Sequence, residues 1–349
     1  MDPEVTAALL VAISSVLVAV VSLAGSLRAQ RRSADSAAEL ETLKDQLAAR
    51  ATSRDAWVAY EFEARKRLYE ECAPLLFQLS EHSERALGRI YGLARTAAAG
   101  NLDPGASWLS RGYYSSSTYY RLIAPLSVGR LLRRRLTHLD LSIDADVLWQ
   151  YTVVRVLMDS FTDDFELAGR GEPAVPLEDR LEYQPHAEGA SELRARDPRR
   201  YWQQGVPRGI LDDAVTSLVV DDDRILDYLE FQAALADGSS TVRRAFDRIG
   251  YLFRDFHPRT RPVLWRILVA QAGLYEAILR APRHGGPDGE TLRDVTRVDT
   301  ARLDWRAPSS DPADRGEVDQ AIRVGLAYAQ QRAEHYFGSA PRPEGRRRP

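Results

Sequence analysis

Four arginines within one short stretch are the residues in this chain best placed to bind a charged group. They are Arg130, Arg133, Arg134 and Arg135. In a helix, spacings of three and four residues put Arg130, Arg133 and Arg134 on one face, and guanidinium groups bind phosphates and carboxylates through paired hydrogen bonds. The pattern predicts a binding site for an anionic ligand or an acidic partner. The alternatives are a solvated helix face paired with nearby acids, or contact with lipid headgroups.

Motifs typical of common enzyme classes are missing from the sequence. It has no H-E-x-x-H pair, no phosphate-binding G-x-x-x-x-G-K-[ST] loop and no G-x-S-x-G nucleophile turn. Asp255 and His257 come nearest to a pair of metal ligands, but their position beside a proline favours a turn or a helix end. Cys72 is the only cysteine, which excludes a Cys-based zinc site. We therefore expect no metal and no cofactor, and the sequence favours a protein that is not an enzyme.

A group of aromatic residues precedes the arginines and could contact a partner. It consists of Trp108, Tyr113, Tyr114, Tyr119 and Tyr120. Together with Arg111 and Arg121, these rings could stack bases or anchor another protein, but packing onto the core is the favoured interpretation. The formal net charge of -3 argues against a nucleic-acid partner, and none is expected.

Residues 5–27 form an uncharged run rich in Val, Leu, Ala and Ile. At 1.5 Å per residue, 23 residues of helix span about 35 Å, enough to cross a bilayer core of about 30 Å. The acidic residues Asp2 and Glu4 before the run argue against a cleaved signal peptide. Arg28, Arg31 and Arg32 follow it, so the positive-inside rule puts the C-terminal side in the cytoplasm. The prediction is a single-pass anchor in the plasma membrane, with the N-terminus outside.

Small residues inside this segment follow the alternating spacing of a heptad and predict a self-association seam. They are Ala8, Ala12, Ser15, Ala19, Ser22 and Ser26. Small side chains let two helices approach closely in lipid. The same register reaches Leu40, Leu43 and Leu47 and then fails at Arg50 and Arg54. Chains sharing one membrane orientation would pair in parallel, whereas the alternative is chance, because about half of the segment consists of small residues.

The rest of the chain reads as an all-α cytoplasmic domain of several helices, because apolar residues recur at helical spacing and convincing strand alternation is absent. Two helical lobes are expected. The predicted parts are residues 1–4 outside the cytoplasm, 5–27 in the membrane, 28–53 as a juxtamembrane helix with a short heptad, 54–168 as a helical lobe, 169–207 as an irregular linker or long loop, 208–340 as a helical lobe and 341–349 as a disordered basic tail.

Proline, glycine and aspartate set the expected helix boundaries. Pro74 should kink or divide the first helix, Pro125 should open or bend the second, and Asp144 should cap the third. Asp221, Asp222 and Asp223 should begin a helix and complement its dipole. The expected helices cover residues 54–98, 119–138, 145–168, 210–220, 221–235, 242–256, 260–279 and 317–337.

Three functions fit these observations. The first is a membrane-tethered interaction or signalling module that self-associates, with a parallel homodimer and an unidentified protein as partners besides the lipid bilayer. The second is a membrane-anchored enzyme or effector that holds an anionic ligand on the arginine face. The third is an effector that acts on the membrane itself by clustering its anchor helices.

Overall fold

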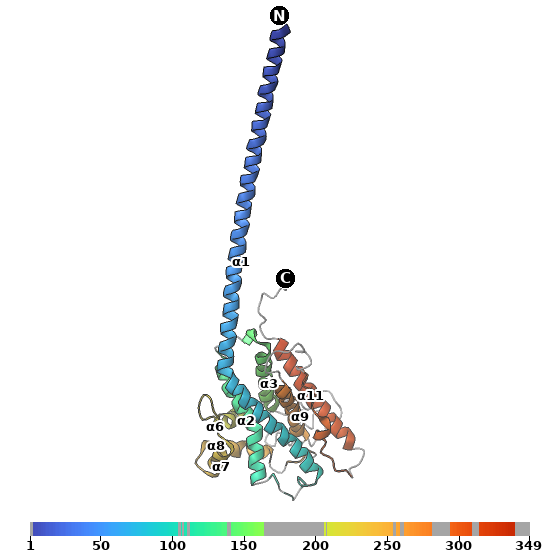
Figure 1. Ribbon diagram of the computed structural model, residues 1–349. Helices are drawn as coiled ribbons and strands as arrows, with labels where there is room; N and C mark the ends of the chain where they lie inside the picture. Colours follow the sequence, from blue (N-terminus) through green and yellow to red (C-terminus); the bar gives the residue numbers. More distant parts are fainter. Residues whose placement is uncertain are drawn as a thin grey trace, which may run out of the picture. The chain divides into compact units, whose positions relative to one another are not determined.

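The structure is a computed structural model (Figure 1). Helices make up nearly all of the residues that it describes. It describes residues 3–103, 106, 108–109, 112–137, 141–163, 206, 208–253, 256–258, 262–280, 294–308 and 314–338. Within these ranges the backbone forms no extended strand, and Val219 and Ile225 make an isolated bridge. The predicted all-α class is therefore confirmed for the described residues.

The helices follow one another along the chain with bounds close to several of those expected. They are α1 (Pro3–Ala98), α2 (Tyr113–Leu136), α3 (Ala145–Thr162), α6 (Arg208–Ser217), α7 (Tyr228–Ala236), α8 (Thr241–Ile249), α9 (Pro262–Arg280) and α11 (Asp314–Gly338), with short 3-10 helices η1 (Leu141–Ile143), η3 (Gly250–Leu252) and η4 (Thr300–Leu303).

The chain divides into two compact units, Met1–Glu63 and Ala64–Pro349. The first unit consists of the N-terminal part of α1, and its side chains from residue 39 to residue 60 are exposed. The second unit contains the described residues of both predicted lobes except residues 54–63, which belong to the first unit. The predicted linker at 169–207 lies outside the described residues except for Val206, and the predicted tail at 341–349 lies outside them entirely.

Within the described residues, no helix is both long and apolar enough to span a membrane. The predicted membrane segment at 5–27 forms part of α1, but most of its side chains lie outside the described set. Ser22 and Ser26 of the predicted seam are described and exposed, whereas Ala8, Ala12, Ser15 and Ala19 are not described. The finding therefore gives the anchor no support, and the anchor stays a prediction.

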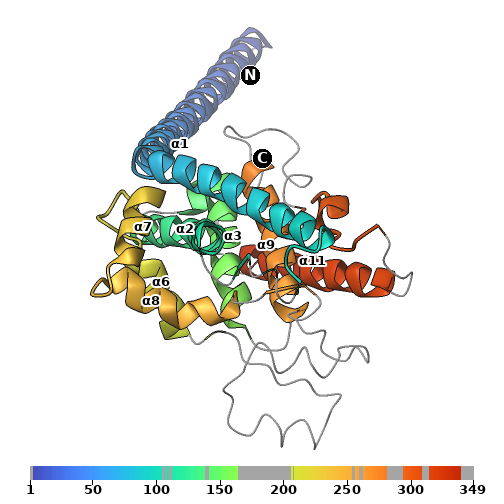
Figure 2. The same cartoon turned by 90° about the horizontal axis from the view of Figure 1, so that it is seen from below.

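The core of the second unit centres on α9, which packs against α3 and α11, while α3 and α11 also pack against each other (Figure 2). On the other side, α2 packs against α3 and α6, and α8 packs against α6 and α7. Among the fully buried side chains are Trp265 and Tyr275 of α9, Phe161 of α3 and Phe231 of α7. Burying large aromatic and aliphatic side chains supplies the main favourable term in folding.

The two prolines do not form helix boundaries. Pro74 lies inside the continuous helix α1 and Pro125 lies inside α2, so the alternatives in which Pro74 divides its helix and Pro125 opens one are wrong, whereas the kink and the bend stay predictions. Asp144 caps α3 as predicted, because its side chain accepts hydrogen bonds from the amides of Asp146 and Val147 at 2.9 and 3.1 Å. A proline costs a helix one backbone bond, and packing of the buried face of α2 offsets that loss.

Asp221, Asp222 and Asp223 do not begin a helix, and the expectation for them was wrong. They lie in a bend before α7, which begins at Tyr228. Asp227 and Glu230 form a capping box there, in which the Asp227 side chain accepts from the Glu230 amide at 2.8 Å and Glu230 accepts from the Asp227 amide at 2.8 Å. The reciprocal pair satisfies amides that no helical carbonyl can reach, so this box fixes the helix start.

Two glycines allow α9 and α11 to approach closely. A Cβ at Gly325 of α11 would lie 2.7 Å from the carbonyl oxygen of Arg266 in α9. A Cβ at Gly273 of α9 would lie 2.5 Å from the carbonyl oxygen of Val295 and 2.8 Å from a methyl group of Leu326. Contacts this short are not tolerated, so glycine at both positions sets the spacing of the two helices.

Replacing Gly325 with alanine should therefore force α11 away from α9 and lower the free energy of unfolding by about 1–3 kcal/mol. Gly209→Ala is the matched control, because nothing lies within 4 Å of a Cβ at that position in α6. The control should leave stability unchanged or raise it by up to about 1 kcal/mol. Urea unfolding of both variants measures the difference, and equal stabilities would contradict the close approach.

His82 of α1 is a buried histidine whose titration links folding to pH. Its ring lies 6.1 Å from the ring of Tyr120 in an edge-on arrangement. Burial, followed by the nearby charge of Arg85, lowers the pKa of His82 to about 4. An unfolded histidine titrates near 6.5, so the unfolded chain binds the extra proton between these two values. Stability should therefore be full above pH 6.5 and fall as the pH drops toward 4.

His82→Leu should remove this part of the acid sensitivity. Between pH 7.5 and pH 5, the native chain should lose about 2 kcal/mol more unfolding free energy than the variant, since each pKa unit corresponds to about 1.4 kcal/mol. Urea unfolding at the two pH values gives both differences. An identical pH dependence in the two proteins would show that His82 is not the titrating group.

Candidate functional site

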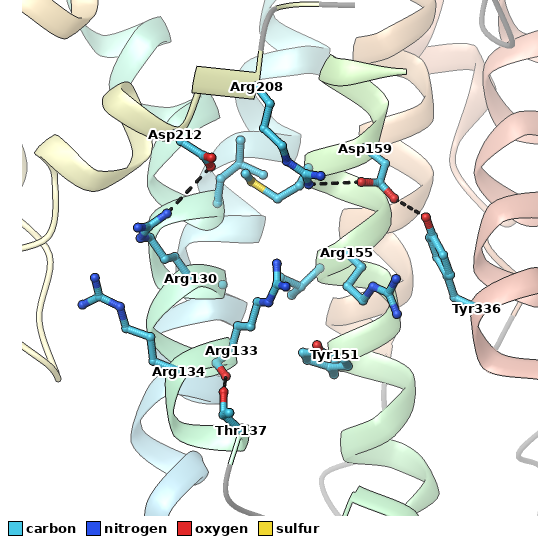
Figure 3. Close-up of a pocket in the computed structure, with 14 residues that line it drawn as sticks. Arg130, Arg133, Arg134, Thr137, Tyr151, Arg155, Asp159, Arg208, Asp212 and Tyr336 are labelled. Atoms are coloured by element: carbon cyan, nitrogen blue, oxygen red, sulfur yellow. Dashed lines mark hydrogen bonds and ion pairs between the residues drawn. The ribbon is translucent and has the colours of Figure 1, made fainter. Parts of the chain in front are cut away.

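A cavity of about 420 Å³ opens between α2 and α3 in the second unit, beside α6 and α11 (Figure 3). The two helices touch at Gly129, where a Cβ would lie 2.4 Å from a methyl group of Val154. The lining side chains come from positions three and four residues apart, which share one face of a helix. They are Leu126, Gly129, Arg130, Arg133, Arg134, Thr137, Tyr151, Val154, Arg155, Met158, Asp159, Arg208, Asp212 and Tyr336.

Guanidinium groups outnumber carboxylates around this cavity. The arginines are Arg130, Arg133 and Arg134 of α2, Arg155 of α3 and Arg208 of α6, whereas the carboxylates are Asp159 and Asp212. Asp212 lies 3.7 Å from Arg130, and Asp159 lies 3.5 Å from Arg208. The lining therefore carries an excess of positive charge, which attracts anions into a cleft with low-dielectric walls.

Arg133 and Arg155 have no carboxylate within ion-pairing distance among the described side chains. The guanidinium of Arg155 lies over the ring of Tyr336, 4.0 Å from its centroid. Arg133 extends between α2 and α3 toward the middle of the cavity (Figure 3). Since an arginine carries five N–H donors, both side chains offer donors that no described carboxylate engages.

Tyr336 fixes the acidic edge of the cavity. Its hydroxyl donates a hydrogen bond of 2.6 Å to Asp159, which also faces Arg208. Burial, with the hydrogen bond to Asp159 and the charge of that carboxylate, raises the pKa of Tyr336. The phenol therefore stays protonated at neutral pH and acts as a donor. Asp159 is occupied by two donors, so its charge is partly neutralised before any ligand enters.

Three of the four predicted arginines line the cavity, and the fourth does not. Arg135 extends elsewhere, where it bonds Asp223 at 2.5 Å and Glu71 at 3.2 Å. Arg134 lines the cavity and also lies 3.9 Å from Asp222. The hydrogen bond and charge of Asp223 raise the pKa of Arg135. A role for Arg135 in joining α2 to other elements follows from these pairs.

The sequence reasoning missed the residues that face the arginines from other helices. Tyr151, Arg155 and Asp159 recur every four residues along α3, a polar stripe on a helix that otherwise buries valines and leucines. That stripe was a usable signal, because four-residue spacing marks one face. Arg208 and Tyr336 gave no such signal, since they are far away in the sequence and only the fold brings them to α3.

The aromatic group divides between core and surface. The Tyr120 hydroxyl donates to the carbonyl of Leu226 at 2.7 Å, and its ring lies 5.3 Å from that of Phe231. Trp108 and Tyr113 are exposed. Arg111 lies outside the described residues. Packing onto the core therefore accounts for Tyr120, while the two exposed rings form no described cavity.

Among the residues that the structure describes, no group of three or more His, Cys, Asp or Glu side chains is arranged to hold a metal ion. His257 lies 3.5 Å from Asp103, whereas its sequence neighbour Asp255 is not described. Cys72 is buried, and burial raises the pKa of its thiol to about 11, so the thiolate that would bind a soft metal is disfavoured.

Comparison of the chain with protein-family models, with curated proteins and with solved structures gave no match in any of the three.

Proposed function

We propose that this protein binds a small anionic ligand of phosphate or carboxylate chemistry in the cavity between α2 and α3. The observation that carries the proposal is the convergence of five arginines from α2, α3 and α6 on one cavity with two carboxylates. Guanidinium groups bind such anions in pairs, and about 420 Å³ falls within the range of small-molecule sites.

The ion pairs at the cavity wall are weak enough for a ligand to replace them. The pairs of Arg130 with Asp212 and of Arg208 with Asp159 are 3.7 and 3.5 Å long, at the loose end of ion pairing. The pair of Arg130 with Asp212 is partly exposed, and exposed pairs contribute only about 0–1 kcal/mol. An anion can therefore draw Arg130 inward at little cost, while Arg133 and Arg155 supply donors that no described carboxylate engages. Tyr336 and Tyr151 present aromatic rings and hydroxyls at the wall of the same cavity.

Reversing the charge of the two arginines that lack a carboxylate should abolish binding. For the full-length chain in nonionic detergent, inorganic pyrophosphate near 100 times its Kd should raise the Tm by about 5 °C at constant ionic strength. Arg133→Glu with Arg155→Glu should show no such rise, because glutamates repel the anion. Scanning calorimetry measures the Tm. A larger rise in Tm with citrate than with pyrophosphate would indicate a preference for carboxylate over phosphate.

Arg243→Glu with Arg244→Glu is the matched control, since it changes the net charge equally on α8, away from the cavity lining. It should keep the full pyrophosphate effect. If the control lost the effect as completely as the cavity variant, or if the native chain showed none with either anion, the cavity would not be an anion site.

We also propose that residues 5–27 tether the protein to the plasma membrane, with the compact unit in the cytoplasm. The uncharged run and the arginines that follow it support this orientation. A site that faces the cytoplasm would meet phosphorylated metabolites and lipid headgroups, and clustering of anchors within the bilayer remains a further role of the same segment.

Ile13→Arg with Leu17→Arg should release the protein from the membrane, because each arginine at the centre of a spanning helix costs about 2.5–3.5 kcal/mol. Leu40→Arg with Leu43→Arg changes the same helix outside the run and should leave the protein in the membrane pellet. Alkaline extraction of cell membranes followed by detection of the chain separates the two results. Retention of the first variant would argue against the tether.

A second candidate function is an interaction module that self-associates through α1, with a protein partner bound to the assembly. Exposure of Leu40, Leu43 and Leu47 favours it, since these three lie on the predicted heptad register and no described residue covers them.

A further inference from the structure

The N-terminal unit carries a stripe of large apolar side chains that extends beyond the three leucines. Leu40, Leu43, Leu47, Val58 and Phe62 are between 53% and 68% exposed. The first three follow heptad spacing, and Val58 comes eleven residues after Leu47. Eleven residues are close to three full turns, so Val58 returns to the same face, and Phe62 follows one turn later. The stripe therefore continues along one face past the two arginines where the heptad fails.

This part of α1 has no tertiary packing of its own. Every described side chain from residue 39 to residue 60 is exposed. Most of the stability of helices in proteins comes from packing of an apolar face, and exposed apolar stripes mark interaction surfaces. The stripe therefore fits a second helix that presents the same kind of face.

The charges beside the stripe fit a second copy of this chain. With Leu40 and Leu43 at the seam, Glu39 and Lys44 occupy the flanking positions, where coiled coils form their interhelical ion pairs. In a parallel pair without stagger, Glu39 of one copy lies beside Lys44 of the other, and the reverse pair forms as well. Both residues are exposed, so both are available. An antiparallel pair would not bring these two positions together.

We propose that residues 40–62 of α1 form a parallel homodimer in which the stripes of two copies pack against each other. The inference rests on the second candidate function and specifies its partner, surface and orientation. Arg50 and Arg54 interrupt the heptad between Leu47 and Val58. The eleven residues from Leu47 to Val58 are accommodated by local unwinding of the supercoil. A charged seam residue also restricts the number of strands, because its long stem must reach water.

Leu43→Glu tests the surface. In sedimentation of the full-length chain in nonionic detergent, the native protein should dimerise and the variant should dissociate with a Kd raised about 100-fold or more, because each seam would bury a charge. Leu229→Glu is the control, since Leu229 is an exposed leucine of α7 in the other unit. The control should dimerise like the native protein.

Two charge variants test the orientation. Lys44→Glu places two acidic residues beside each other in a parallel pair and should weaken the dimer about tenfold. Adding Glu39→Lys to it restores opposite charges and should restore the native Kd. Leu43→Cys should give a disulfide-linked dimer on mild oxidation, because Cys72 is buried and the new thiol is accessible.

Results other than those expected would each overturn a specific part of the proposal. A native chain that stays monomeric overturns both self-association and this inference. A dimer that survives Leu43→Glu leaves self-association standing and moves it to another surface. A dimer that Leu43→Glu dissociates but that neither regains affinity with Glu39→Lys nor cross-links at residue 43 is not parallel. None of these results bears on the pyrophosphate measurement, so the anion site and the dimer are judged separately.

Discussion

The compact unit depends on the burial of α9 on all of its sides. Every residue from Leu264 to Tyr275 is buried, a run of more than three turns that covers all faces of this helix. A helix that is buried all round cannot face water and must be covered by other elements. α3 and α11 cover it, and they also pack against each other. Gly325 brings the backbone of α11 against the carbonyl oxygen of Arg266 in α9, which limits how these two helices can be arranged.

This packing decides which side of α3 remains for a ligand. Val153, Val156 and Leu157 are buried in the core, whereas Tyr151 and Arg155 line the cavity. α2 and α3 pack against each other, and at one point of this contact Gly129 leaves room for a methyl group of Val154. The cavity lies beside this contact and is lined by arginines of both helices.

Carboxylates from distant parts of the chain hold the arginines of α2. Arg130 pairs with Asp212 of α6, while Arg134 and Arg135 pair with Asp222 and Asp223 in the bend before α7. These pairs are partly exposed and individually weak, so they orient the side chains without fixing them. Of these arginines, Arg130 and Arg134 line the cavity, so their weak pairs would yield to an anion bound at the proposed site. The helix of the N-terminal unit leaves a stripe of apolar side chains exposed, and the proposed dimer would bury this area.

The all-α class and most helix cores followed from the sequence alone, because helical periodicity is a local property. Asp144 as a cap, and the shared face of Arg130, Arg133 and Arg134, needed only neighbouring residues to be recognised. The spacing of Leu40, Leu43 and Leu47 was visible in the same way. Local patterns therefore determined the secondary structure and one wall of the candidate site.

Tertiary structure decided what those local patterns could not. Helices α1 and α2 continue through Pro74 and Pro125, although each proline removes a backbone hydrogen bond. The acidic run before α7 faces arginines instead of a helix end. Arg155, Arg208 and Tyr336 reach the cavity only because α3, α6 and α11 come together in space. The physical reason is that a site built from several helices depends on long-range packing, which the spacing of residues along one helix does not encode.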